Sequence, residues 1–284
     1  QAGVQVAAVV TAPDKPSGRG LQMQSSAVKK YAEAHHIPVL QPVKLKDPIF
    51  IEELKALQGD LQVVVAFRML PEIVWNMPPM GTINVHASLL PQYRGAAPIN
   101  WAVINGEKET GVTTFKLKHE IDTGDILLQE RVAILPDDNA GTSHDKLMQE
   151  GAKLLVRTVE GLAEGTLKEV PQSSIAGELK HAPKIFKEDM RIDWHQTAEE
   201  INNLIRGLSP YPTSFTMLNN KQLKIYRSRL EYDATLPEAG SFDTDHRTYL
   251  RFAAKDGWVY AEEIQMEGKK RMAIAEFLKG FRSN

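Results

Sequence analysis

The chain has 284 residues, of which 42% are hydrophobic and 25% charged, with a formal net charge of −2. This composition is typical of a globular protein long enough for two domains, and it shows no global positive field for a polyanion. The absence of cysteine excludes disulfides, thiolate nucleophiles and cysteine-based zinc sites. The apolar runs have strand length and the start lacks signal-peptide features, so we expect a cytoplasmic protein.

The first half of the chain alternates apolar runs with helical patterns. We predict strands at 4–10, 61–67 and 82–87, and helices at 26–36, 49–57 and 96–105. This alternation predicts an α/β fold with an open, mostly parallel sheet, which binds ligands beyond the carboxyl ends of its strands. Because a buried strand would begin almost at the first residue, we expect the natural chain to be longer.

The second half passes from helical patterns to short strands. We predict strands at 111–117 and 126–134, a long helix at 141–164 and a short helix at 197–208. Strand patterns recur around 214–218, 222–230, 248–253 and 258–266 and predict a small β-barrel or sandwich. The expected organisation is a first domain over 1–188, a linker over 189–208 and a C-terminal β domain over 209–284.

Asn84 and His86 stand two apart at the end of a predicted strand. Side chains at i and i+2 of a strand lie on the same face, so the amide and the imidazole converge. Together they can donate hydrogen bonds to one developing oxyanion. A hydrogen-bonded polar pair at a sheet end is the alternative interpretation.

Two loops lie beyond neighbouring strand ends. The loop SLLP, residues 88–91, carries paired leucines that either wall a flat apolar ligand or anchor the loop on the core. The sequence EIDTGD contains Asp122, which either belongs to a simple turn or lies against His86 and fixes its tautomer.

The loop TAPDKPSGRG carries Lys15 and Arg19 and predicts either a basic finger for phosphates or a flexible surface loop. Its glycines form no dinucleotide or Walker motif, and no metal-ligand spacing such as H-E-x-x-H occurs. Basic residues also recur in the C-terminal domain, where they either track a phosphate backbone or form a mixed solvated surface. They are Lys221, Lys224, Arg227, Arg229, Lys269, Lys270, Arg271, Lys279 and Arg282.

Taken together, these stretches resemble the folate-dependent formyltransferases over nearly the whole chain. The sequence from NVHASLLPQYRG to EIDTGDILLQ resembles the family core. VTAPDKPSGRG resembles the loop with which members acting on initiator methionyl-tRNA grip the acceptor stem. RIDW, IRGLSPYP and GKKRM resemble the linker and C-terminal domain of those members.

The resemblance implies a Rossmann-like catalytic domain and a C-terminal barrel similar to the OB fold. It implies 10-formyltetrahydrofolate as donor, initiator methionyl-tRNA as acceptor, no metal, and a role in translation initiation. Separately from the resemblance, we expect a cytoplasmic monomer. The family usually begins with a strand–helix unit that is not found here. The residue roles that the resemblance implies are catalysis for Asn84, His86 and Asp122, folate binding for Ser88, Leu89, Leu90, Pro91, Phe67, Arg68 and Leu70, and tRNA binding for Lys15 and Arg19.

Two other functions remain open at this stage. A formyltransferase for a small amine, such as a nucleotide-linked amino sugar, would use the same three catalytic residues without a basic loop. A non-catalytic RNA-binding protein on this scaffold would not need Asn84, His86 and Asp122 as a set.

Overall fold

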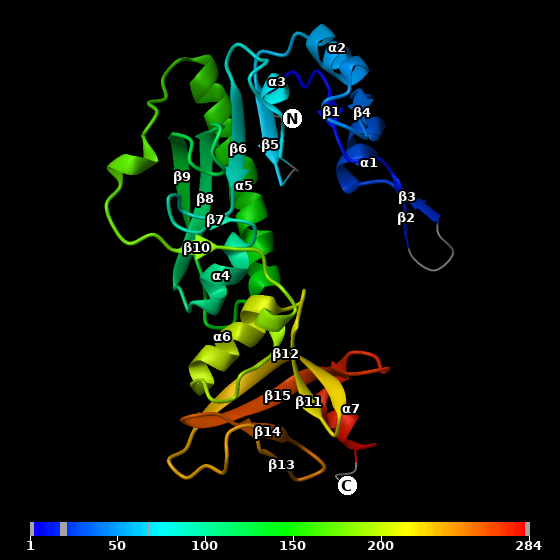
Figure 1. The fold of residues 1–284 in the computed structure, drawn as a ribbon, viewed down its shortest axis with the longest axis vertical. Helices are drawn as coiled ribbons and strands as arrows, with labels where there is room; N and C mark the ends of the chain where they lie inside the picture. The colour runs from blue at the N-terminus through cyan, green and yellow to red at the C-terminus, as the bar shows by residue number, and fades with distance from the viewer. Residues whose placement is uncertain (1–2, 18–21, 67–68, 282–284) are drawn as a thin grey trace. The chain divides into compact units, whose positions relative to one another are not determined.

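The computed structural model describes residues 3–17, 22–66 and 69–281 (Figure 1). Arg19, Phe67, Arg68 and Arg282 therefore lie outside the described residues. By their internal contacts the residues form two compact units. One consists of segments 1–86, 114–127 and 155–171, and the other of 87–113, 128–154 and 172–284.

The first unit begins with two short strands around a helix. β1 (Val9–Val10) pairs in parallel with β4 (Val39–Leu40), and α1 (Ala27–Ala34) joins them after its N-cap Ser26. The predicted buried strand over 4–10 is wrong for residues 4–8, because the ladder to β4 contains only Val9 and Val10. The side chains of Val4 and Val6 are 45% and 50% exposed, so hydrophobicity alone did not place them in a packed strand.

An antiparallel hairpin lies between β1 and α1 in the sequence and extends away from both elements in Figure 1. It consists of β2 (Lys15–Ser17) and β3 (Gln22–Gln24), with Lys15 opposite Gln24. The sequence predicts only a loop here, because a ladder of three residues is too short to show a periodic pattern.

The sheet of the first half has the strand order β5–β6–β8–β9. β5 (Gln62–Val65) is parallel to β6 (Thr82–His86), and the connection between them contains α3 (Glu72–Trp75). α2 (Pro48–Ala56) precedes β5 and begins after the capping side chain of Asp47. The parallel pairs β1–β4 and β5–β6 agree with the expected wound sheet.

The sheet continues with a hairpin and a long helix. β8 (Glu109–Lys116) and β9 (Ile126–Ala133) run antiparallel, since Lys116 N–H donates to Asp125 C=O and Ile134 N–H donates to Lys108 C=O. α5 (Ala140–Ala163) follows over 24 residues. These elements match the predictions within two residues, because long periodic patterns are the clearest local signal.

The second unit contains two helices that approach each other closely. α4 (Pro98–Ile104) packs on α6 (Ala198–Leu208), where Asn100 Nδ2 donates to the carbonyl of Gly207 at 2.8 Å. A Cβ at Gly207 would lie 2.5 Å from Ile104 Cγ1, so glycine permits this packing. The short elements of the same region are β7 (Arg94–Gly95), η1 (Gln172–Ser174), β10 (His181–Ala182) and η2 (Glu188–Met190).

The C-terminal part of this unit is an antiparallel sheet of order β11–β12–β15–β14–β13, with β16 beside β15. The 12-residue β12 pairs with both β11 and β15 and contains register shifts around Arg227. Such irregularities bend a strand and let the sheet curl over its core. The bounds are β11 (Ser214–Leu218), β12 (Lys221–Tyr232), β13 (Phe242–Thr244), β14 (Leu250–Ala253), β15 (Gly257–Met266), β16 (Met272–Ala273) and α7 (Ile274–Leu278).

An extensive hydrophobic core lies between α6 and this sheet. Ile201 and Ile205 of α6 meet Leu223, Ile225 and other fully buried side chains. Trp194 stacks on Phe252 with ring centroids 4.6 Å apart and donates its indole N–H to Thr216 Oγ1. The helix that precedes the sheet in the sequence is therefore part of its core.

Candidate active site

Strand β6 presents the predicted polar pair at its carboxyl end. Asn84 is half-buried and pairs with Val64 of β5, whereas His86 is the last residue of the strand and only 8% exposed. Ile83, on the opposite face, is fully buried. The alternation of the pleat therefore directs Asn84 and His86 to one face of the sheet.

Asp122 lies beside His86, which is one of the two interpretations that the sequence left open. Asp122 Oδ2 is 3.8 Å from His86 Nδ1, and the two side chains are 13% and 9% exposed. The distance between these two atoms is longer than a direct hydrogen bond. The edge of the Phe115 ring meets the imidazole at a centroid distance of 6.5 Å and an interplanar angle of 82°. Phe115 is not among the residues predicted for the site, although an aromatic residue inside a predicted strand is a signal that could have indicated it.

The loop that carries Asp122 has a backbone that only certain residues accept. Asp122 adopts a φ of 56°, a left-handed conformation that Asp tolerates better than most residues. A Cβ at Gly124 would lie 1.6 Å from the carbonyl oxygen of Lys116, so this position requires glycine. Lys118 pairs with Asp125 at 2.8 Å and Thr123 Oγ1 donates to the Glu120 carbonyl. These contacts hold the loop in the shape that brings Asp122 to His86.

Buried hydrogen bonds fix the loop that follows β6. Leu90 N–H donates to Thr113 Oγ1 at 3.1 Å, and Thr113 Oγ1 donates to the Ser88 carbonyl at 2.6 Å. Gln129 Nε2 donates to the Leu90 carbonyl at 2.8 Å. Ser88 is fully buried and Leu90 is 1% exposed. Of the two interpretations of the paired leucines, a ligand wall or an anchor on the core, the anchor is the one that fits the buried side chain of Leu90.

Leu89 and Pro91 have different surroundings. Leu89 is half-buried, and a Cβ at Gly111 would lie 2.5 Å from its Cδ2, so Leu89 packs directly on the backbone of β8. Pro91 is buried and follows a cis peptide bond. Folate binding by residues 88–91 stays a prediction.

Of the predicted folate-binding residues before β6, the structure describes Leu70. Leu70 is partly buried against a small cluster formed by Leu45, Phe50 and Val74. Phe67 and Arg68 lie outside the described residues. Their assignment to the folate site stays a prediction.

The predicted basic loop is anchored at its base by Asp14. Its carboxylate accepts hydrogen bonds from Lys29 Nζ at 2.6 Å, Ser25 Oγ at 3.1 Å and Gln41 Nε2 at 3.0 Å. The hydrogen bond from Lys29 is the main cause that holds the pKa of Asp14 below its usual value. Lys15, the next residue, is exposed on β2. Among the described residues of the loop, Lys15 is thus held on a hairpin with a fixed base.

Three arginines of the C-terminal domain contact glutamate side chains or an aromatic ring. Arg271 pairs with Glu263 at 2.7 Å and Arg227 pairs with Glu262 at 2.9 Å. Arg229 lies 3.6 Å from the centroid of the Tyr260 ring. A phosphate-binding surface and a mixed solvated surface both stay open as interpretations of these basic residues.

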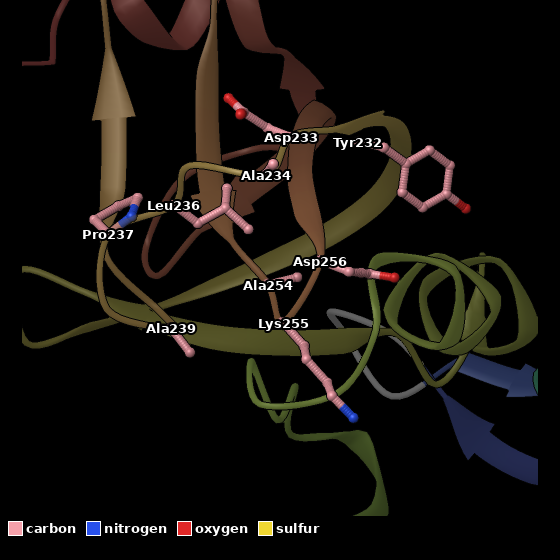
Figure 2. Close-up of a pocket in the computed structure, with 9 residues that line it drawn as sticks. All are labelled: Tyr232, Asp233, Ala234, Leu236, Pro237, Ala239, Ala254, Lys255 and Asp256. Atoms are coloured by element: carbon pink, nitrogen blue, oxygen red, sulfur yellow. The ribbon is translucent and has the colours of Figure 1, made fainter.

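The larger of two described hollows lies in the C-terminal sheet and has a volume of about 710 Å³ (Figure 2). Figure 2 shows the nine residues that line it, which are Tyr232, Asp233, Ala234, Leu236, Pro237, Ala239, Ala254, Lys255 and Asp256. The second hollow, of about 640 Å³, lies around the start of α5 and Tyr211. Neither contains a residue predicted for catalysis, folate binding or tRNA binding.

Within the described ranges, no group of three or more histidine, aspartate or glutamate side chains is arranged to hold a metal ion. In the same ranges, every helix is too short or too polar to cross a membrane.

Comparison with known proteins gives matches over both halves of the chain. Residues 1–159 match the family model described as formyl transferase, and residues 184–282 match the formyl transferase C-terminal domain. A methionyl-tRNA formyltransferase of Bacteroides fragilis is 52% identical over 288 residues, covering 99% of this chain and 89% of that protein. The corresponding protein of Parabacteroides distasonis is 53% identical, covering 99% and 90%.

Solved structures support the fold. HypX from Aquifex aeolicus in complex with tetrahydrofolic acid superimposes with a TM-score of 0.67 at 18% identity, covering 99% of this chain and 49% of that chain. The N-formyltransferase from Helicobacter canadensis, in complex with folinic acid and dTDP-3-aminofucose, gives 0.65 at 19% identity, covering 90% and 99%. The predicted fold class is thereby confirmed as a Rossmann-like domain with a mostly parallel sheet and a C-terminal domain with a curled, barrel-like sheet.

Proposed function

The chain belongs to the formyl transferase family, and from this premise we propose that it formylates the amino group of initiator methionyl-tRNA with 10-formyltetrahydrofolate as donor. The observation that supports the acceptor is the identity of 52% and 53% to methionyl-tRNA formyltransferases over 99% of the chain. The reaction would supply formylated initiator tRNA for translation. We place it in the cytoplasm and assign it to a monomer.

The chemistry is the transfer of a formyl group between two nitrogen atoms. The free amine of the methionyl group attacks the formyl carbon on N10 of the donor, and the carbonyl oxygen becomes an oxyanion. The bond from the formyl carbon to N10 then breaks, and a proton moves from the attacking amine to N10. The products are N-formylmethionyl-tRNA and tetrahydrofolate.

Asn84 and His86 have the geometry to stabilise the oxyanion. They share one face at the end of β6, and both side chains can donate a hydrogen bond to the same oxygen atom. Removal of one such donor typically reduces kcat by about 10²–10³. Burial of His86 strengthens this interaction, because water competes less for the donor.

Asp122 would orient the imidazole and help to move the proton. Its carboxylate is 3.8 Å from Nδ1, which leaves Nε2 of His86 as the ring nitrogen directed toward the substrate. Catalytic hydrogen bonds are often long before substrate binds and shorten in the complex. Ser88–Pro91, with Leu70, Phe67 and Arg68, would hold the folate.

Lys15 and Arg19 would contact the acceptor stem of the tRNA. Lys15 is exposed on a hairpin whose base is fixed by Asp14. A lysine in this place offers a compact point charge to a phosphate.

A transfer assay with a radiolabelled formyl donor tests the function. We expect transfer to charged initiator tRNA and none to free methionine or to an amino-sugar nucleotide. Transfer to the amino sugar in preference to the tRNA would overturn the proposed acceptor.

The variant His86→Ala tests the site. We expect kcat to fall by about 10²–10⁴, the range for a positioned acid–base group, while tRNA binding persists. His144→Ala is the control, because this histidine is exposed on α5 and pairs with Asp145. Turnover at the wild-type rate in His86→Ala would remove this residue from the mechanism.

A further inference from the structure

We infer that residues 172–183, called the strap below, position the loop of residues 88–95 for binding of the folate donor. The inference rests on the proposed function. The strap lies between the two family matches, which end at 159 and begin again at 184, so neither includes it. The strap and the loop belong to the same compact unit.

The backbones of the strap and the loop are joined directly. β10 of the strap pairs in parallel with β7 of the loop, with Ala182 opposite Gly95. Tyr93 N–H donates to the Lys180 carbonyl at 2.6 Å. Gly95 has a φ of +126°, and a Cβ there would lie 2.4 Å from the Ala182 carbonyl oxygen. The approach is therefore close enough to require glycine in the loop.

Gln92 connects the strap to the folate-binding residues. Its Nε2 donates to the Glu178 carbonyl at 3.0 Å, and its Oε1 accepts from Lys180 N–H at 2.8 Å. In the other direction, Ser88 Oγ donates to the Gln92 carbonyl at 2.6 Å. A continuous series of hydrogen bonds thus leads from the strap to Ser88.

Arg94 makes a second side-chain connection. Its Nε and one terminal nitrogen both donate to Gln172 Oε1, at 2.9 and 2.7 Å. Gln172 is only 3% exposed, and a planar guanidinium held at two nitrogens has little freedom to turn. This contact fixes the orientation of the loop after Tyr93.

Glu107 provides a third connection from outside both segments. It accepts a hydrogen bond from Tyr93 of the loop at 2.6 Å and forms an ion pair with Lys180 of the strap. Burial, together with the hydrogen bond to Glu107, raises the pKa of Tyr93, so the phenol stays a donor. The two segments are therefore tied to one carboxylate.

These contacts matter because the loop has almost no regular structure of its own. Between β6 and β7 the backbone forms only turns and bends, and such a segment loses conformational entropy when a ligand binds. A loop that is already held in the bound conformation avoids this cost. The strap would therefore increase the affinity for the folate donor and leave the affinity for tRNA unchanged.

The variant Gln92→Ala tests the inference, because it removes both bonds to the strap and keeps every predicted folate-binding residue. We expect the KM for 10-formyltetrahydrofolate and the Kd for folinic acid to rise about tenfold, equivalent to about 1.4 kcal/mol. The KM for methionyl-tRNA should change less than about twofold, since no contact to the hairpin is lost. Gln149→Ala, on the exposed surface of α5, is the matched control and should change neither constant.

A second pair of variants separates positioning from folding. Gln172→Leu removes the acceptor for Arg94 and should raise the folinic acid Kd, whereas Gln172→Glu keeps an acceptor oxygen and should restore affinity. Unchanged Kd values in Gln92→Ala and Gln172→Leu, or equal rises in both KM values, would overturn the inference. The proposed function is judged separately, by formyl transfer to tRNA in the wild-type protein.

Discussion

The absence of a side chain at Gly124 permits the loop conformation that places Asp122 beside His86. A Cβ there would meet the Lys116 carbonyl oxygen at 1.6 Å, and this oxygen belongs to the backbone and cannot rotate away. We predict that Gly124→Ala destabilises the protein by about 2 kcal/mol or more and lowers kcat, because the loop must move away from β8. Gly59→Ala, where no atom lies within 4 Å of the Cβ, is the control. Equal melting temperatures for both variants would contradict the prediction.

Ser143 carries a buried hydroxyl group without a hydrogen-bond partner among the described residues. Its side chain is 2% exposed, so the hydroxyl loses its hydration on folding and gains no hydrogen bond in exchange. We predict that Ser143→Ala leaves the free energy of unfolding unchanged or raises it. Ser214→Ala, which removes a hydroxyl that donates to the Ile225 carbonyl, should cost about 1 kcal/mol. Urea unfolding of both variants measures the difference.

The sequence predicted the convergence of Asn84 and His86 because strand parity is a local property. It offered Asp122 as a partner of His86, and the structure brings the two within 3.8 Å. The sequence alone could not show whether Leu90 lines a ligand site or anchors its loop on the hydrophobic core. That answer depends on Thr113 and Gln129, which come from other strands. Contacts between residues far apart in sequence have no local pattern.

At the scale of elements, α5 depends on a buried carboxylate before its first turn. Asp138 accepts hydrogen bonds from Leu135 N–H at 2.7 Å and Thr142 Oγ1 at 2.9 Å, and pairs with Lys146. Burial raises the pKa of Asp138, but Lys146 and these hydrogen bonds outweigh it and hold the pKa below the ordinary 3.8. The ionised form is therefore stabilised by folding.

The sign of the pH dependence follows from this lowered pKa. Asp138 contributes stability that is fully present above pH 3.8 and is lost as the pH falls through its lower folded value. We predict that Asp138→Asn destabilises the protein by about 1.5–3 kcal/mol at a pH of about 7, the range for hydrogen bonds to charged groups, and by less under strongly acidic conditions. Asp137→Asn, at an exposed neighbour, is the control. An equal loss at both pH values would contradict the prediction.

Long periodic elements were predictable and short paired ones were not. The helix at 141–164 and the strand at 214–218 were found within one residue of their observed ends. β7 and β10 have two residues each and exist because they pair with each other from distant parts of the sequence. Hydrophobic periodicity cannot show such pairs, since two residues have no period.

At the scale of the whole molecule, the net charge of −2 means that attraction to tRNA must come from local charges. The exposed Lys15 is one of them, whereas several arginines of the C-terminal sheet pair with glutamates. We predict that Lys15→Ala raises the KM for tRNA. It should also lower the slope of log affinity against log salt by about 0.9, the value for one phosphate contact. Lys46→Ala, at another exposed lysine, is the control, and an unchanged slope in Lys15→Ala would remove Lys15 from the tRNA site.

The predicted domain boundaries, 1–188 and 209–284 with a linker between them, stay a prediction. Limited proteolysis that cuts first within 189–208 would support them. The packing of α6 into the core of the C-terminal sheet argues that any stable C-terminal fragment must include Ala198–Leu208.

The position of the strap has a consequence for building chimaeras from two related enzymes. A crossover at 160–171 would follow the end of the first family match and look natural in an alignment. It would join the loop containing Gln92 and Arg94 from one parent to the strap of the other, and so separate side chains that bond to each other. A crossover after Pro183 keeps both segments from the same parent. A crossover that keeps the strap and the loop together must therefore lie beyond the end of the first family match.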